Sequence, residues 1–179
     1  MSSTIGVQNI AHTNGTSAMT IASDGGVYVK NHVLDVYQHT SSTQTSGNST
    51  ANYNSTGLFL TLTPKSSASK FLLTFHGAVH NNTANGYVVA NIVVNPTSST
   101  DINTVMTGGT LITDQTYGMA HINMVSSVYV SQLSASILHA PNTTSPVTYN
   151  VVYKRAVRGV TFWAINNALT TLTAMEIGG

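Results

Sequence analysis

Apolar residues in this chain gather in short runs, and a new run begins about every ten residues. The runs are rich in Val, Ile, Tyr and Thr, which favour a pleated and half-buried strand. No long stretch keeps a helical period of 3.6 residues between capping residues. The pattern predicts strands over residues 58–63, 71–79, 86–94, 104–112, 120–130, 134–138, 147–154, 159–165 and 169–177.

Turn-forming residues separate these runs. Proline fixes one backbone angle, and glycine and asparagine tolerate the left-handed conformation that tight turns require. The connections carry Pro64-Lys65-Ser66, Asn81-Asn82, Asn95-Pro96, Gly108-Gly109, Pro141-Asn142 and Asn166-Asn167. Eight or nine short strands at this spacing predict an all-β fold, a β-sandwich of the jelly-roll type.

The first 37 residues are predicted to form a separate arm, with the sandwich domain over residues 38–179. A strand at 18–22, a turn at Asp24-Gly25 and a second strand from Val27 indicate a β-hairpin. An isolated hairpin is marginal in water, so the arm needs a partner surface. Its apolar attachment residues would be Ile5, Val7, Ile10, Met19, Ile21, Val27 and Val29. Residues 39–57 are nearly all Ser, Thr, Asn and Gly, which fits either a flexible linker or a solvated strand pair.

The chain is unusually poor in charge. Charged residues make up 6% of the sequence and the net charge is +1, so no electric field favours nucleic acid or anionic lipid as a partner. Cysteine is missing, which excludes disulfides and a thiol nucleophile. The amino terminus lacks the features of a secretory signal, and no apolar run is long enough to insert in a membrane. We therefore expect synthesis in a host cytoplasm.

The sequence offers no convincing catalytic, metal or cofactor site. Glycoside hydrolysis needs two facing carboxylates, and nothing in the pattern pairs any of the acids, which are Asp24, Asp35, Asp101, Asp114 and Glu176. His76 and His80 would lie roughly 13 Å apart on a strand, too far for one metal ion. Tyrosines and Trp163 could form a sugar platform if exposed, but Trp163 is expected in the core. The chain is therefore expected not to be an enzyme.

Several stretches taken together resemble structural proteins of marine bacteriophage particles. They are "NIAHTNGTSAMTIASDGGVYV", "LTLTPKSSASKFLLTFHGAVH", "TSPVTYNVVYKRA" and "TLTAMEIGG", in this order. Such proteins are similar in fold to the trimeric jelly rolls of the C1q and tumour-necrosis-factor type. The resemblance covers almost the whole chain. It implies a homotrimer on the exterior of a virion, with the last strand close to the three-fold axis.

The last strand carries Glu176, the single glutamate of the chain. The resemblance places Leu172, Met175, Glu176 and Ile177 in the trimer core, or else Leu172 and Ala174 if the other face is buried. A buried carboxylate needs a partner, and the predicted candidates are Lys154, Arg155 and Arg158. The alternative is that Glu176 faces solvent at a sheet edge.

Two functions fit such a trimer. The first is a capsid decoration or cement protein, whose arm binds the major capsid protein or a tail or portal protein. The alternative is a short tail fibre or head fibre that binds a host receptor or glycan. We favour decoration, because the sequence contains no heptad, collagen or β-helix repeat that would form a shaft.

Overall fold

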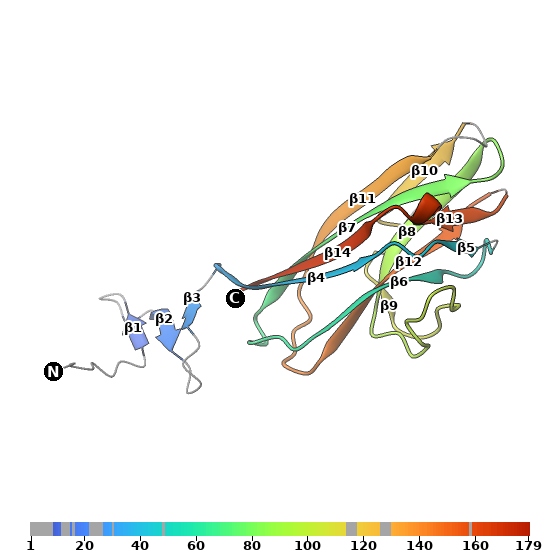
Figure 1. Cartoon of the computed structure of the whole chain (residues 1–179). Helices are drawn as coiled ribbons and strands as arrows, with labels where there is room; N and C mark the ends of the chain where they lie inside the picture. Colours follow the sequence, from blue (N-terminus) through green and yellow to red (C-terminus); the bar gives the residue numbers. More distant parts are fainter. Residues whose placement is uncertain are drawn as a thin grey trace.

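The structure is a computed structural model, and it describes residues 9–11, 15, 17–21, 27–29, 31–47, 49–113, 118–125, 130–157 and 159–179. These residues form antiparallel β-strands and one short 3₁₀ turn, η1 (Ile165–Asn167). Two large sheets pack face to face, and a small third sheet lies at the amino-terminal end (Figure 1). The predicted all-β sandwich is confirmed.

The first large sheet is essentially four strands wide. β11 (Ser131–His139) pairs with β7 (Lys70–Asn81), β7 with β14 (Thr170–Ile177), and β14 with β4 (Val33–Ser41). At one end, β13 (Thr161–Trp163) pairs with both β7 and β5 (Thr45–Gly47). β4 and β11 are the two edges of this sheet.

The second large sheet has the order β10 (Ala120–Met124), β8 (Gly86–Val94), β12 (Val147–Arg155) and β6 (Asn54–Leu62). The two-residue β9 (Thr110–Leu111) also pairs with β8. The chain changes sheets between β5 and β6, β6 and β7, β7 and β8, β10 and β11, β11 and β12, and β12 and β13. This repeated crossing between two antiparallel sheets is the jelly-roll arrangement that the strand spacing predicted.

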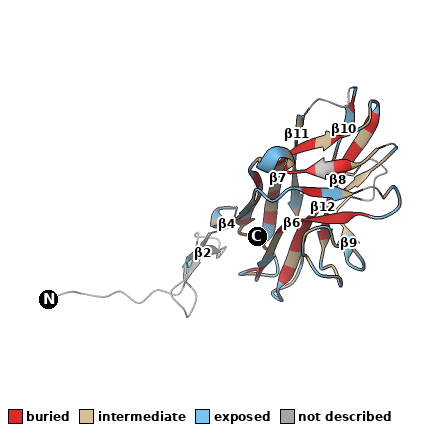
Figure 2. Cartoon of the chain, turned by 45° about the vertical axis from the view of Figure 1, so that its right-hand side comes forward, coloured by how far each residue is buried: buried red, intermediate tan, exposed pale blue. Residues whose placement is uncertain are grey.

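The core follows from the two-residue period of the strands. Phe71, Leu73 and Phe75 of β7 are fully buried between the sheets, and the residues between them face outward. Trp163 fills the middle of the core against Phe75 and Tyr153. Gly77 lies directly beneath the Trp163 ring, where an added Cβ would clash. The burial is concentrated in the strands of the sandwich (Figure 2).

The second sheet is covered on its outer face as well. Tyr53, Val89, Val93 and Val152 form a small cluster there, and Met106 packs against it. Met106 belongs to the segment between β8 and β9, where Gly108 and Gly109 have positive φ values of 64° and 69°. The strand predicted over 104–112 is therefore wrong except at β9. Its apolar residues anchor a loop, and the glycine pair ends the extended conformation.

Other predicted boundaries also shift. β10 ends at Met124, so the strand predicted to 130 is shorter, and residues 126–129 lie outside the described part. β13 ends at Trp163 because Ala164 and Asn166 adopt left-handed φ values of 53° and 56°. The stretch 39–57 contains the end of β4, all of β5 and the start of β6, so it is not a linker. It is not a solvated strand pair either, because Thr45, Ser55 and Thr56 are buried and β5 and β6 belong to different sheets.

The amino-terminal sheet consists of β1 (Asn9–Ala11), β2 (Ser17–Ile21) and β3 (Val27–Val29), in that order. It lies to one side of the sandwich (Figure 1). The predicted hairpin corresponds to β2 and β3, and its Asp24-Gly25 turn falls outside the described residues. The predicted boundary at residue 37 lies inside β4, which pairs with β14 from Val33 onward. The sandwich strands therefore begin at Val33, five residues before the predicted start at residue 38.

Candidate assembly surface

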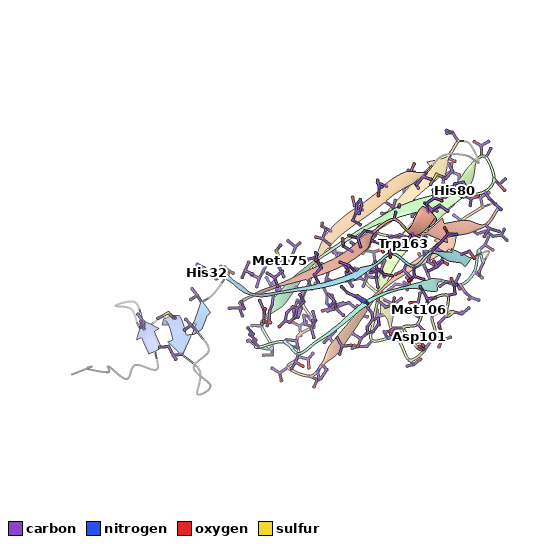
Figure 3. All side chains as sticks on the ribbon, viewed as in Figure 1. His32, His80, Asp101, Met106, Trp163 and Met175 are labelled. Carbon is purple, nitrogen blue, oxygen red and sulfur yellow. The ribbon has the colours of Figure 1, made fainter. Side chains whose placement is uncertain are left out.

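The outer face of the first sheet carries a row of apolar side chains that crosses all four strands. Val36 of β4 lies opposite Met175 of β14, Met175 opposite Leu72 of β7, and Leu72 opposite Leu138 of β11. Val36 is 54% exposed, Met175 36% and Leu138 52%, while Leu72 is half-buried. We call these four residues the apolar row. Met175 is labelled near the amino-terminal end of the sandwich in Figure 3.

A β-bulge extends this surface at the β4 edge. Glu176 pairs with Asp35, but Ile177 pairs with Val33, so Leu34 is the extra residue of β4. Ile177 and Met175 share a face because side chains alternate along a strand. Their partners Val33 and Val36 therefore share that face too. Val33 is 56% exposed, and the two valines make a small apolar projection on the edge strand.

The row next to the apolar row, on the side away from the arm, is polar, and its side chains bond to one another. The side-chain amide of Gln38 donates to Oγ1 of Thr173 at 3.2 Å. The hydroxyls of Thr74 and Ser136 lie 2.8 Å apart in the same row. Polar side chains that satisfy one another in this way tolerate water. The apolar row thus lies at the end of the sheet next to the arm.

Glu176 points into the sandwich from the opposite face of β14. It is fully buried, as are Leu172 and Ala174 on the same face. The main-chain N–H of Lys65 donates to Oε1 of Glu176 at 2.7 Å, while Oε2 has no hydrogen-bond partner among the described residues. The alternative that Glu176 faces solvent is wrong.

Two of the three predicted partners of Glu176, Lys154 and Arg155, lie elsewhere. Lys154 lies over the ring of Tyr53, 4.5 Å from its centre, on the outer cluster of the second sheet. Nη1 of Arg155 donates to the carbonyl of Gly159 at 2.8 Å, and Arg158 is outside the described part. The prediction failed for Lys154 and Arg155 because they belong to β12, which is a strand of the other sheet. The β6–β7 turn, in contrast, lies next to the end of β14.

Lys65 connects this turn to β4. Its Nζ lies 3.2 Å from Oδ2 of Asp35 and donates to the carbonyl of Leu34 at 3.2 Å. The Val36 N–H and the Lys65 ammonium hold the pKa of Asp35 below its ordinary value. Burial, followed by the hydrogen bond to Asp35, raises the pKa of Tyr37 to about 12. Asp35 and Glu176 are cross-strand neighbours, which the sequence pattern did not indicate.

The arm and the sandwich meet beside this cluster. The N–H of Asn31 donates to the carbonyl of Gly178 at 2.7 Å, and the N–H of Gly178 donates to the carbonyl of His32 at 2.9 Å. Among the predicted attachment residues, Ile10 and Val27 are exposed, and Met19, Ile21 and Val29 are half-buried. Ile5 and Val7 lie outside the described residues.

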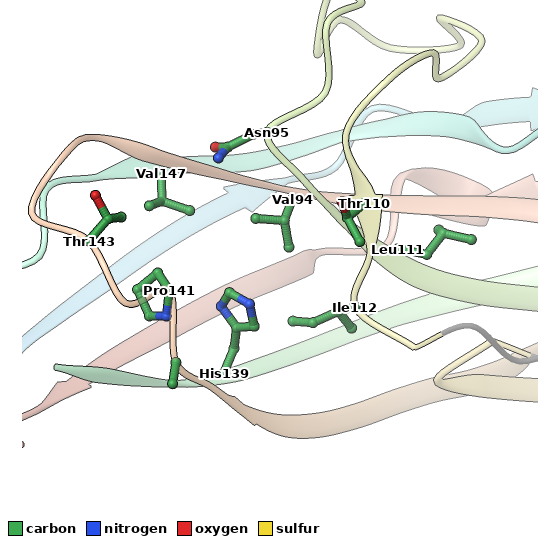
Figure 4. A pocket seen from close by; sticks show the side chains of 10 residues that line it. Val94, Asn95, Thr110, Leu111, Ile112, His139, Pro141, Thr143 and Val147 are labelled. Atoms are coloured by element: carbon green, nitrogen blue, oxygen red, sulfur yellow. The ribbon is translucent and has the colours of Figure 1, made fainter. Parts of the chain in front are cut away.

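A pocket of about 320 Å³ opens near the β11 edge, at the same end of the sandwich (Figure 4). Its walls are mostly apolar, with His139 facing into it from β11. Nδ1 of His139 is hydrogen-bonded to the hydroxyl of the buried Tyr149 at 2.9 Å. Burial lowers the pKa of His139 below its ordinary value of 6.5. The other lining residues are Val94, Asn95, Thr110, Leu111, Ile112, Ala140, Pro141, Thr143 and Val147.

Metal-ligating side chains do not gather in the described part of the chain, where no group of three or more His, Asp or Glu could hold an ion. His76 and His80 both lie on β7, as predicted. The described residues include no helix that is long and apolar enough to span a membrane.

Comparisons with known proteins give only a distant likeness. No protein-family model matches the chain, and no curated protein matches it. A structure of infectious bursal disease virus, Gx strain, is 10% identical with a TM-score of 0.41, over 84% of this chain and 40% of that one. The Gt strain structure is 12% identical with a TM-score of 0.41, over 91% and 47%. The chain thus spans less than half of the chains it matches, and TM-scores below 0.5 support no functional conclusion.

Proposed function

We propose that this chain is a non-enzymatic structural protein of a bacteriophage particle, which assembles as a homotrimer on the particle exterior and is held there by its arm. The observation that carries the assembly is the apolar row on the outer face of the first sheet. The assignment to a virion, and the number three, rest on the resemblance of the sequence to marine bacteriophage structural proteins.

The apolar row argues for association because it is continuous. Isolated apolar residues on a protein surface need no explanation, but contiguous apolar patches mark interaction sites. Here the row crosses the sheet from edge to edge and continues to Val33 and Ile177. Its neighbours on the side away from the arm are satisfied hydroxyl and amide groups, and on the other side Lys70 pairs with Ile177. A copy of the same chain can remove this surface from water.

The arm is proposed as the attachment device. Its three short strands form a sheet of their own, and Ile10 and Val27 remain exposed on it. Small sheets are marginal unless they pack on another surface, and an exposed strand edge can add to a partner's sheet through main-chain hydrogen bonds. Three arms on one trimer would give firm attachment even if each contact is weak.

The alternative, a short fibre that binds a host receptor or glycan, has one observation in its favour. At the end of the sandwich away from the arm, the β7–β8 loop bonds to both neighbouring loops, through Asn85 to Met124 and through Asn82 to Val160. Val125, Val130 and Val157 are exposed in these neighbouring loops. Such a tip could meet a host surface. We still prefer the decoration function over the fibre, because the apolar row and the arm are both explained by assembly.

A reconstruction of the assembled particle tests the proposal. Decoration requires the chain to lie on the capsid as trimers, with residues 1–32 against a capsid protein. A chain found on a tail or head fibre, with purified trimers that bind host cells or a glycan array, would replace decoration by recognition. A chain that is monomeric at micromolar concentration in solution and on the particle would contradict the trimer itself.

A further inference from the structure

The pocket beside β11 continues the apolar row around the edge of the sheet. Leu138 and His139 are consecutive residues of β11 and so point to opposite faces. Leu138 ends the apolar row on the outside, and His139 faces the pocket on the inside (Figure 4). The next residues, Ala140 and Pro141, form part of the pocket wall. The end of the apolar row and the start of the pocket are therefore neighbouring residues on the two faces of β11.

The opposite edge of the same sheet carries an apolar projection. The bulge at Leu34 places Val33 and Val36 on one face of β4, and both are more than half exposed. They are branched aliphatic side chains without charge or hydrogen-bonding groups. The pocket, about 320 Å³ and lined by Ile112, Val147 and other apolar residues, has room for such side chains.

The projection and the pocket lie at the same level of the sandwich. The register places Val36, Met175, Leu72 and Leu138 in one row across the strands. The pocket begins one residue beyond Leu138. Rotation about an axis parallel to the strands keeps every residue at its level along that axis. A closed ring of identical subunits needs two different complementary patches, and patches at equal levels on opposite edges meet this requirement.

We propose that Val33 and Val36 of one copy insert into the pocket beside β11 of the next copy, so that each subunit provides one projection and one socket. This inference rests on the proposed homotrimer and names its contact. The contact is heterologous, which allows a ring of three. The apolar row between the two edges then lines the inside of the ring.

Cysteine cross-linking can test this contact cleanly, because the chain has no cysteine of its own. The test variant is Val36→Cys with Pro141→Cys in the full chain, treated with a mild oxidant or a short bis-maleimide. We expect covalent dimers and trimers, with the 36–141 link identified by mass spectrometry. Val33→Cys with Pro141→Cys is a second pair, in case Val36→Cys disturbs the β4 edge.

The matched control is Thr61→Cys with Pro141→Cys. Thr61 is exposed on β6, beside the Leu62–Val147 pair, so it lies near the same end of the sandwich but on the other sheet. We expect this pair to cross-link several-fold less than the test pair. Mixing the single variants Val36→Cys and Pro141→Cys should give only dimers that join the two positions.

Light scattering on the same samples separates the two hypotheses. Trimers that show no 36–141 and no 33–141 link would overturn the socket and leave the homotrimer standing. Links between two copies of position 36 would also overturn it, because they indicate a symmetric contact. Monomers alone would overturn both hypotheses. As a second readout, Ile112→Trp should fill the socket and weaken association while the subunit stays folded.

Discussion

The carboxylate of Glu176 accepts a hydrogen bond from the main chain of Lys65, a residue 111 positions away in the sequence. This contact ties the last strand to the β6–β7 turn, whose lysine side chain holds β4 at Asp35. The single glutamate thus organises the end of the sandwich from which the arm emerges. Its role in the structure of one subunit is to position a turn.

Two substitutions of Glu176 should distinguish the contribution of its hydrogen bond to stability from the contribution of its charge. Glu176→Ala leaves the Lys65 N–H without its acceptor and opens a cavity, so we expect it to lower the free energy of unfolding by about 1–3 kcal/mol. Glu176→Gln keeps an acceptor oxygen and removes a buried charge, and it should lie within about 1 kcal/mol of the wild type. Urea unfolding measures both. Equal damage by the two variants would mean that the negative charge itself is required.

The apolar row should tolerate no charge if it is an interface. Met175→Lys places an ammonium in the middle of the row, and we expect it to weaken association at least about tenfold while the subunit stays folded. Thr173→Lys, one row away on the same strand, is the matched control. Sedimentation velocity and circular dichroism measure the two effects. Unchanged association in Met175→Lys would exclude the row from the contact.

Loss of the arm should abolish attachment and spare the trimer. Because β4 begins at Val33, a deletion of residues 1–30 removes the arm without cutting into the sandwich. We expect soluble trimers that no longer co-sediment with particles lacking this protein. The full chain, added to the same particles, is the control. Binding that survives the deletion would assign attachment to the sandwich.

The stability of the fold should fall in mild acid partly through His139. Burial lowers the pKa of His139, so the unfolded chain takes up a proton at higher pH than the folded one. The contribution is fully present above pH 6.5 and is lost as pH falls through the lowered pKa of the folded state. In His139→Gln, the midpoint of unfolding should change less with pH between about pH 7 and 5 than it does in the wild type. An unchanged pH profile would contradict a contribution of His139 to the acid sensitivity.

The packing of Gly77 against Trp163 should allow no side chain at position 77. A methyl group there would overlap the indole ring, and we expect Gly77→Ala to cost about 1–3 kcal/mol of unfolding free energy. Trp163→Leu makes room for the methyl group. The double variant should therefore lose less stability than the sum of the losses in the two single variants. A double-mutant cycle measured by thermal unfolding tests this. Strict additivity would show that the two sites do not touch.

Much of the fold follows from local sequence patterns. Alternating residues such as Phe71, Leu73 and Phe75 predict a half-buried strand wherever they occur, and the turn residues between such runs predict the sandwich. The strand at Asn9–Ala11 was missed because three residues carry no period. The loop around Met106 was mistaken for a strand because its apolar residues anchor it to an outer cluster that only the folded sheet creates.

The candidate site was harder to predict because it depends on register. The sequence drew attention to Glu176 and the last strand, but the pairing of Met175 with Val36 and Leu72 is a property of strands far apart in the chain. The bulge at Leu34, which turns Val33 to the same face as Val36, left no local signal. Lys65 was noted only as a turn residue. Lys65 becomes the partner of Glu176 because the β6–β7 turn lies next to the end of β14.

The paired hydroxyl groups of Thr61 and Thr148, which are exposed on the sheet that does not carry the apolar row, have a consequence for the proposed particle. Ions screen forces between charges, but they leave neutral hydrogen-bonding groups hydrated. A coat built from this chain would therefore keep particles dispersed by bound water rather than by electrostatic repulsion. Added salt would change the repulsion between such particles little, because little of that repulsion is electrostatic.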